Sequence, residues 1–232
     1  MTSNTVAALK GRVIRVIKLD ACGNVPTGTG SSMVVADGFI SVKNTPQYDD
    51  GTEFLQKRAD GLLCVNQKDP GQFKRLQAEA LWCVTDPDIR VIMEGARLLT
   101  SGGVTGTGAA FNDGLITNRF SIEIWQNVAG RNACNSAGQQ QYIYWAFPNC
   151  GNAQAQDFTV ENNILQWHET YETMGLGQGA TAPLAAWGTF PTALPPNTYL
   201  GAGNNFVVSE HYAYNLTTTA PPTPTGGAVT VT

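Results

Sequence analysis

Apolar and polar residues alternate along most of the chain, and short runs of turn-forming residues separate the alternating segments. A period of two is typical of half-buried strands, and its repetition indicates antiparallel β structure. The clearest example is residues 73–84, where one face is apolar and the other is polar. The apolar positions are Leu76, Ala78, Ala80 and Trp82, which alternate with Arg75, Gln77 and Glu79. This segment therefore predicts a strand with one buried face.

Similar patterns predict strands in both halves of the chain. They are expected at 12–19, 31–36, 39–43, 52–58, 62–65, 119–127, 141–147, 158–160, 164–171 and 206–216. An Asp-Gly pair between apolar runs is a strong hairpin signal, so Asp37-Gly38 and Asp60-Gly61 each predict that the strands on either side pair. Residues 141–147, QYIYWAF, are apolar on both faces. This indicates contact with a second surface in addition to the core.

One helix is predicted, at 86–94. Asp86 is a suitable N-cap, Pro87 suits the first helical position, and Gly95 can cap the C-terminus. The Gly/Thr-rich stretch 101–108 is expected to be a loop. Residues 174–204 contain mainly Gly, Pro, Ala and Thr, and they are too many for an idle connection in a compact domain.

Composition narrows the class of protein. The chain has 232 residues, a length that suits one large all-β domain or two small ones. Charged residues make up 14% and the net charge is −4, with the basic residues scattered, so tight nucleic-acid binding is not expected. No apolar run approaches the roughly 18 residues of a membrane helix. The N-terminus lacks the pattern of a secretory signal, so we expect synthesis in the cytoplasm.

The five cysteines are Cys22, Cys64, Cys83, Cys134 and Cys150. No C-x-x-C pair occurs, which disfavours a zinc site. Cys83 lies in an apolar run and is expected to be a buried thiol. Cys134 and Cys150 flank an expected strand, and whether they pair is left open.

Motifs for catalysis are weak. The Gly-rich runs lack the Lys-Ser/Thr of a phosphate loop, and His168-Glu169 lacks the second histidine of a zinc protease. A glycosidase needs two carboxylates across a sugar. The acids that could serve are Glu123, Glu161, Glu169 and Glu210, on expected strands that also carry Trp125 and Trp167. No metal, cofactor or catalytic residue is assigned, and the glycosidase and a carbohydrate-binding or virion-decoration β-sandwich remain as alternatives.

Low charge, strands with two apolar faces and long neutral loops together indicate a subunit covered by its own copies. The cores of protein interfaces are depleted in Lys, Glu and Asp and enriched in aromatic residues. A polymerising structural protein is therefore favoured over an enzyme.

An ordered series of segments resembles the major tail proteins of long-tailed bacteriophages, particularly those infecting actinobacteria. The segments are RVIRVIKLDACGNVP (12–26), ADGFISVKN (36–44), CVTDP (83–87), FSIEIWQNVAGRNAC (120–134), YIYWAFPNCGN (142–152), DFTVEN (157–162) and TTTAPPTP (217–224). The resemblance spans nearly the whole chain, although the loop 174–204 has no counterpart in it.

The resemblance implies a tail tube fold, an antiparallel β-sandwich or partial barrel with one flanking helix. Residues 1–216 would form this domain, and 217–232 a Thr/Pro-rich tail. Six copies would close into a ring, and rings would stack into a hollow tube around a tape-measure protein. Tail terminator and distal tail proteins would be further partners. Assembly in the host cytoplasm would place the protein in the virion, where the channel passes DNA without binding it tightly.

The strand pairs expected to line the channel are 39–43 with 52–58, and 119–127 with 141–147. Ile40, Val42, Ile122 and Ile124 would face the core of the subunit. The candidates for the channel surface are Lys43, Glu53, Lys57 and Glu123. A neutral to acidic channel avoids the Lys and Arg contacts that would hold DNA phosphates. Loops 44–52 and 174–204, with both termini, are the expected contacts between rings.

Overall fold

Strands make up most of the structure, a computed structural model that describes residues 7–23, 25, 32–84, 86–101, 105–130, 133–160, 162, 166–175, 206 and 209–229. The expected loop 174–204 lies almost entirely outside these residues. In chain order the elements are β1 Ala7–Leu19, β2 Met33–Ala36, β3 Phe39–Asp49, β4 Glu53–Lys57, β5 Leu63–Lys68, β6 Gln72–Trp82, α1 Pro87–Glu94, β7 Arg97–Ser101, β8 Thr105–Ala110, β9 Arg119–Ala129, β10 Tyr142–Ala155, β11 Trp167–Thr173 and β12 Ala213–Thr217.

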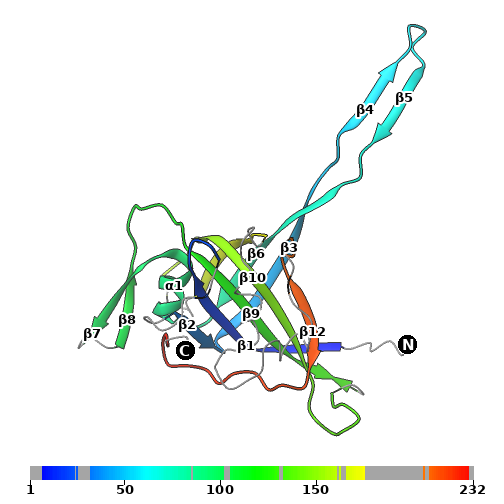
Figure 1. Ribbon diagram of the computed structural model, residues 1–232. Coiled ribbons are helices and arrows are strands. Elements are labelled where there is room, and N and C mark those ends of the chain that lie inside the picture. The colour runs from blue at the N-terminus through cyan, green and yellow to red at the C-terminus, as the bar shows by residue number, and fades with distance from the viewer. Residues whose placement is uncertain are drawn as a thin grey trace.

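Eight strands form one antiparallel sheet, which curls but does not close (Figure 1). Its order is β2-β1-β9-β10-β11-β6-β3, and β12 pairs with β10. The curl brings Phe39 of β3 against Gly11 of β1, where a Cβ atom would collide with the phenyl ring. β2 and β3 nevertheless stay unpaired with each other at the two ends of the strand order. The expectation of a mainly antiparallel β fold with one helix is confirmed.

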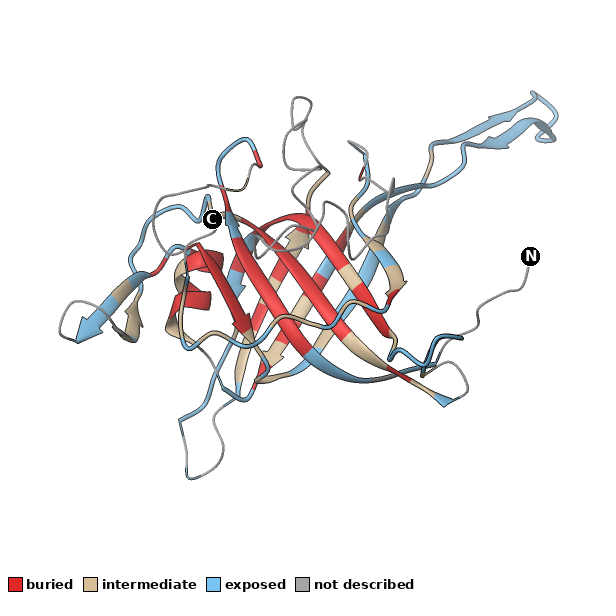
Figure 2. Cartoon of the chain, turned by 60° about the horizontal axis from the view of Figure 1, so that its bottom comes forward, coloured by how far each residue is buried: buried red, intermediate tan, exposed pale blue. Residues whose placement is uncertain are grey.

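The curled sheet encloses the main core. Alternate residues of β1, β6 and β9 point inward, including Ile14, Trp82 and Ile122, all fully buried. Helix α1 adds Ile89 and Ile92 to the same cluster. In Figure 2 the buried residues lie along the central strands and the helix.

A second cluster lies on the outer face of the sheet, over β1, β2, β9 and β10. It comprises Val13, Val35, Trp125, Tyr142, Tyr144, Ala146 and Phe206. The strand that is apolar on both faces therefore has both faces buried within one subunit. For these strands the two-sided pattern needs no neighbouring molecule to explain it.

The helix forms as its local signals predict. The carboxylate of Asp86 accepts a hydrogen bond from the backbone N–H of Asp88, and Pro87 begins the helix. Gly95 ends it with φ of 76°, a left-handed conformation that glycine adopts without strain. This eight-residue helix is the only one among the described residues, and it is not long and apolar enough to cross a membrane.

Several local predictions are wrong. Asp37-Gly38 does not join a hairpin, because β2 pairs with β1 and β3 pairs with β6. The carbonyl of Gly38 instead accepts the backbone N–H groups of Cys83 and Val84, which fixes the crossing between the two ends of the sheet. The stretch 101–108, expected as a loop, contributes to the β7–β8 hairpin.

Three further expectations change. Residues 158–160 are not a strand, and the last strand begins at Ala213 rather than 206. Cys83 is exposed and only Cys150 is buried, and all five thiols are free, so Cys134 and Cys150 do not pair.

Candidate assembly surfaces

A two-stranded arm, residues 50–71, projects from the sheet (Figure 1). It continues β3 and β6 outward as the β4–β5 hairpin, which confirms the pairing predicted from Asp60-Gly61. Its large apolar side chains are at least 45% exposed: Phe54, Leu55, Leu62, Leu63 and Val65. An isolated hairpin is marginally stable in water, and exposed apolar clusters usually mark interaction sites. The arm therefore has the properties of a contact element.

The two faces of the arm differ in charge. Phe54 lies opposite Gln67, and Gln56 lies opposite Val65, so within β4 and β5 this face carries no charged residue. On the other face Glu53 lies opposite Lys68, and Leu55 lies between Glu53 and Lys57 on β4. Alternate residues of a strand share a face. Burying the uncharged face therefore costs less desolvation free energy than burying the charged face.

The base of the arm is closely joined. A Cβ atom on Gly51 would collide with the backbone carbonyl of Asp69, so only glycine allows the two chains to approach this closely. The N–H of Asp69 donates to the carbonyl oxygen of Thr52, 3.0 Å away. Directly below, Asp49 pairs with Gln72 as the last register pair of β3 and β6. The arm is therefore anchored in the main sheet by paired backbone.

The two end strands of the sheet present different edges. Among the described residues, β3 has β6 on one side and no strand on the other. β3 includes Pro46, and a proline within a strand is tolerated at a sheet edge. The outer side of β2 instead contacts the C-terminal residues of the same chain. An unpaired edge is a site at which another chain can add a strand.

The four channel candidates do not come together. Lys43 lies on the outer face of β3, is 72% exposed, and approaches Glu79 at 3.5 Å. Glu53 and Lys57 lie on the charged face of the arm. The strand pairing proposed for them is also different, because β3 pairs with β6, and β4 with β5. The other expected pair, β9 with β10, is confirmed.

Glu123 is not a channel residue within this fold, because its side chain is 1% exposed. Its carboxylate forms an ion pair with Arg15, the residue opposite it on β1, and accepts a hydrogen bond from the hydroxyl of Tyr144. Arg15 also lies over the ring of Trp125 at 5.3 Å. A buried carboxylate needs such partners to offset the loss of water. The expectation that Glu123 faces the channel is wrong.

Of the residues expected to face the core, Ile122 and Ile124 do so and Val42 packs against the cluster. Ile40 does not, because it is 46% exposed.

A second buried ion cluster joins the helix to the sheet. The Nη2 of Arg90 donates to Glu94 at 3.1 Å, and its Nε lies 3.2 Å from Glu169 on β11. The guanidinium also lies about 5 Å from the rings of Phe111 and Trp167. Two carboxylates face one cation, so the cluster has excess negative charge. Burial, reinforced by the charge of Glu94, raises the pKa of Glu169 to about 7, although Arg90 opposes the shift.

The carboxylates considered for a glycosidase are not arranged as a pair. Glu123 and Glu169 are buried in separate ion clusters, on the outer and the inner side of the sheet. Glu210 is exposed, and Glu161 lies outside the described residues. In the described part of the chain, no three His, Cys, Asp or Glu side chains are placed to hold a metal ion.

Comparison with known proteins adds no assignment. No protein-family model matches the chain, and no curated protein sequence matches it either.

Proposed function

We propose that this chain is the subunit of a hollow tube of the kind built by the major tail proteins of long-tailed bacteriophages. Six copies form a ring, and rings stack around a tape-measure protein, with tail terminator and distal tail proteins at the ends. DNA passes through the finished channel without tight binding. The protein is assembled in the host cytoplasm and functions in the virion.

The observation that carries the proposal is the arm. Its exposed apolar residues and closely joined base make it a preformed element without an intramolecular partner surface among the described residues. The open edge of β3 continues into the arm, so one end of the subunit offers both backbone and apolar contacts. The ordered resemblance of seven sequence segments supplies the class of assembly. Together they favour a polymer of identical subunits over a monomeric binding module.

Electron microscopy of the purified protein tests this proposal directly. Concentrated protein is expected to form hollow tubes or six-fold rings in negative stain. A protein that stays monomeric at every concentration would contradict the proposal and favour the alternative of a decoration or carbohydrate-binding module. Sugar binding followed by tryptophan fluorescence would then be the next measurement.

An arm-less variant tests the role of the arm. Asp49 and Gln72 lie directly opposite each other, so residues 50–71 can be replaced by Asn-Gly, which forms a two-residue hairpin turn. We expect a folded subunit with unchanged far-UV circular dichroism and no tubes. Tubes formed by this variant would exclude the arm as an assembly element.

Two point variants identify the contacting face. Phe54 and Leu55 are each 52% exposed but lie on opposite faces of β4. Phe54→Lys places a charge on the uncharged face and should prevent assembly. Leu55→Lys adds a charge beside Glu53 and Lys57 and is the matched control. The opposite result would assign the contact to the charged face.

A further inference from the structure

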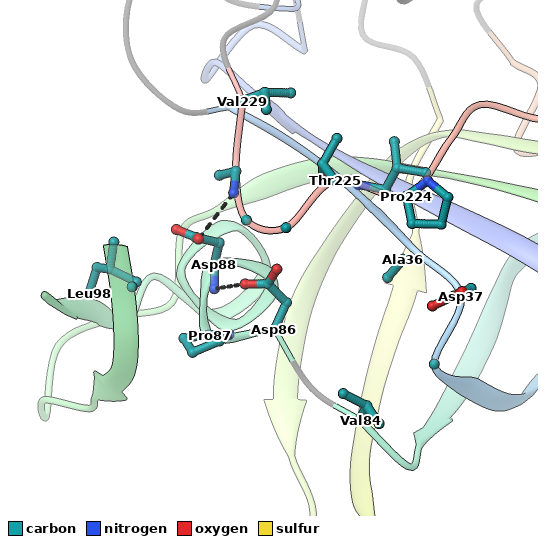
Figure 3. A pocket seen from close by; sticks show the side chains of 16 residues that line it. Ala36, Asp37, Val84, Asp86, Pro87, Asp88, Leu98, Pro224, Thr225 and Val229 are labelled. Carbon is teal, nitrogen blue, oxygen red and sulfur yellow. Dashed lines mark hydrogen bonds between the residues drawn. The ribbon is translucent and has the colours of Figure 1, made fainter. Parts of the chain in front are cut away.

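The C-terminal residues 224–229, which we call the strap, lie along the free side of β2. The chain reaches them from β12 through a short proline-containing stretch, Pro221-Pro222, and passes over the start of helix α1. Figure 3 shows the strap beside β2 and the helix, with the backbone N–H of Ala228 directed at the carboxylate of Asp88. The strap is therefore the only neighbour of this sheet edge among the described residues.

The strap occupies every backbone group that β2 directs away from β1. The N–H of Met33 donates to the carbonyl of Val229 at 3.1 Å, and the N–H of Val229 donates back at 2.8 Å. The N–H of Thr225 donates to the carbonyl of Val35 at 2.9 Å, and the hydroxyl of Thr225 accepts the N–H of Val35 at 3.1 Å. Since these four groups define the edge of a four-residue strand, the edge is fully covered.

Packing contributes little to the strap's attachment. None of its residues is buried, Val229 is 36% exposed, and the small Ala228 is the strap residue that packs against the main core. A cavity of about 550 Å³ lies between the strap, the start of the helix and Leu98. Gly226 and Gly227 add backbone freedom that attachment must restrict. Ordering six residues costs at least as much free energy as the edge hydrogen bonds return, so these bonds alone hold the strap only weakly.

We propose that the edge of β2 is a docking site for β3 of a second copy, and that the strap covers it until assembly begins. This inference rests on the proposed function, because it assigns one contact within the assembly. During assembly β3 of the second copy replaces the strap. β3 is an edge strand with no strand on its outer side among the described residues. The same backbone groups of Met33 and Val35 serve first the strap and then the incoming strand.

β3 fits this site because it is the other end of the same sheet. Pairing β3 of one copy with β2 of the next joins unlike edges, and such head-to-tail contacts can repeat around a ring. The pairing segment precedes Pro46, which cannot donate a backbone hydrogen bond. Capping an edge within the free subunit also prevents uncontrolled strand pairing before assembly.

A shortened chain ending at Thr223 removes the strap and leaves every strand of the sheet intact. If the strap competes with β3, the shortened chain should assemble at a protein concentration about tenfold lower than the full chain, a factor that corresponds to a net preference of about 1.4 kcal/mol for the attached strap. Circular dichroism and thermal unfolding check that it folds. Light scattering and mass photometry measure association whether or not tubes form.

A covalent lock provides the reverse test in a single molecule. Met33 and Val229 exchange two hydrogen bonds, so their Cα atoms are roughly 5.5 Å apart, within the range that a disulfide spans. The Met33→Cys/Val229→Cys variant should be unable to assemble when oxidised and should recover on reduction. Its background replaces the exposed thiols with serine at Cys22, Cys64, Cys83 and Cys134.

Each outcome has a definite meaning. Equal assembly of the oxidised and reduced lock, or an unchanged threshold for the shortened chain, would overturn the proposal. Loss of assembly in the shortened chain would also overturn it and would show that the strap itself connects copies. Association of the shortened chain into small oligomers without tubes would support the covered edge while contradicting the tube function. If tubes form and neither the truncation nor the lock affects them, the tube function is supported and the edge of β2 is excluded as the docking site.

Discussion

The buried cluster of Arg90, Glu94 and Glu169 predicts that the fold loses stability as the pH rises from about 4.5 toward neutrality. Glu169 is fully buried and shares one arginine with a second carboxylate. Burial, with the charge of Glu94 added, raises its pKa from 4.5 to about 7. The folded chain therefore binds this proton more tightly than the unfolded chain does. The free energy of unfolding must fall as the pH rises from about 4.5 to 7 and then level off.

The variant Glu169→Gln isolates this effect, because a neutral amide replaces the titrating group and leaves the Arg90–Glu94 pair balanced. Titration of one group with these two pKa values lowers the free energy of unfolding by about 2.5 kcal/mol between pH 5 and pH 8. The variant lacks that loss. Packing contributes equally at both pH values, so the change in the difference between pH 5 and pH 8 reports the proton alone.

Urea unfolding followed by tryptophan fluorescence at pH 5, 6, 7 and 8 measures both proteins. We expect Glu169→Gln to gain stability relative to the natural sequence at each step up to pH 7 and little beyond it. The raised pKa of Glu94 affects both proteins and largely cancels in the comparison. A difference that stays constant from pH 5 to pH 8 would refute the reasoning, since Glu169 would then be ionised in the folded chain throughout.

Two further predictions concern single positions. Glu123→Lys should destabilise the fold by about 3–5 kcal/mol, because it leaves Arg15 buried beside a like charge. At a channel residue the same substitution would change DNA passage and leave stability unchanged. Chemical unfolding of the variant distinguishes the two roles. Gly95→Ala should cost about 1 kcal/mol at the left-handed helix end, while Gly61→Ala, also left-handed but in the arm turn, should leave the thermal unfolding of the sheet unchanged.

Local signals in the sequence predicted local structure well. The helix begins and ends where Asp86, Pro87 and Gly95 indicate, because capping depends on residues within one turn. The same holds for the arm, whose hairpin follows from Asp60-Gly61. The Asp37-Gly38 prediction was wrong because partner choice depends on distant strands. Here the turn crosses from one end of the sheet to the other.

The candidate surfaces were harder to predict, since alternation cannot say what covers the second face of a strand. Glu123 alternates with Ile122 and Ile124 as a solvent-facing residue would. Its burial depends on Arg15, which lies opposite it across β1 and β9. The available signal was the immediate setting of each residue, since Arg15 lies within VIRVI and Glu123 within SIEIW. The strap had no such signal, because it is held mainly by backbone groups, and the Thr225 hydroxyl is the one side-chain group of the strap described as bonding to β2.

The low content of charged residues favours assembly through the surface it leaves, and not through the strands with two apolar faces. The strands with two apolar faces are covered within the subunit, so they no longer argue for neighbouring copies. Several of the few charged residues are also buried, which leaves the surface poorer in charge than the sequence suggests. They are Arg15, Asp88, Arg90, Glu94, Glu123 and Glu169. Repulsion between copies is correspondingly weak, and an exposed apolar arm on such a surface favours self-association. A subunit of the proposed tube needs a means of delaying strand pairing, and this is the role that we propose for the strap over β2.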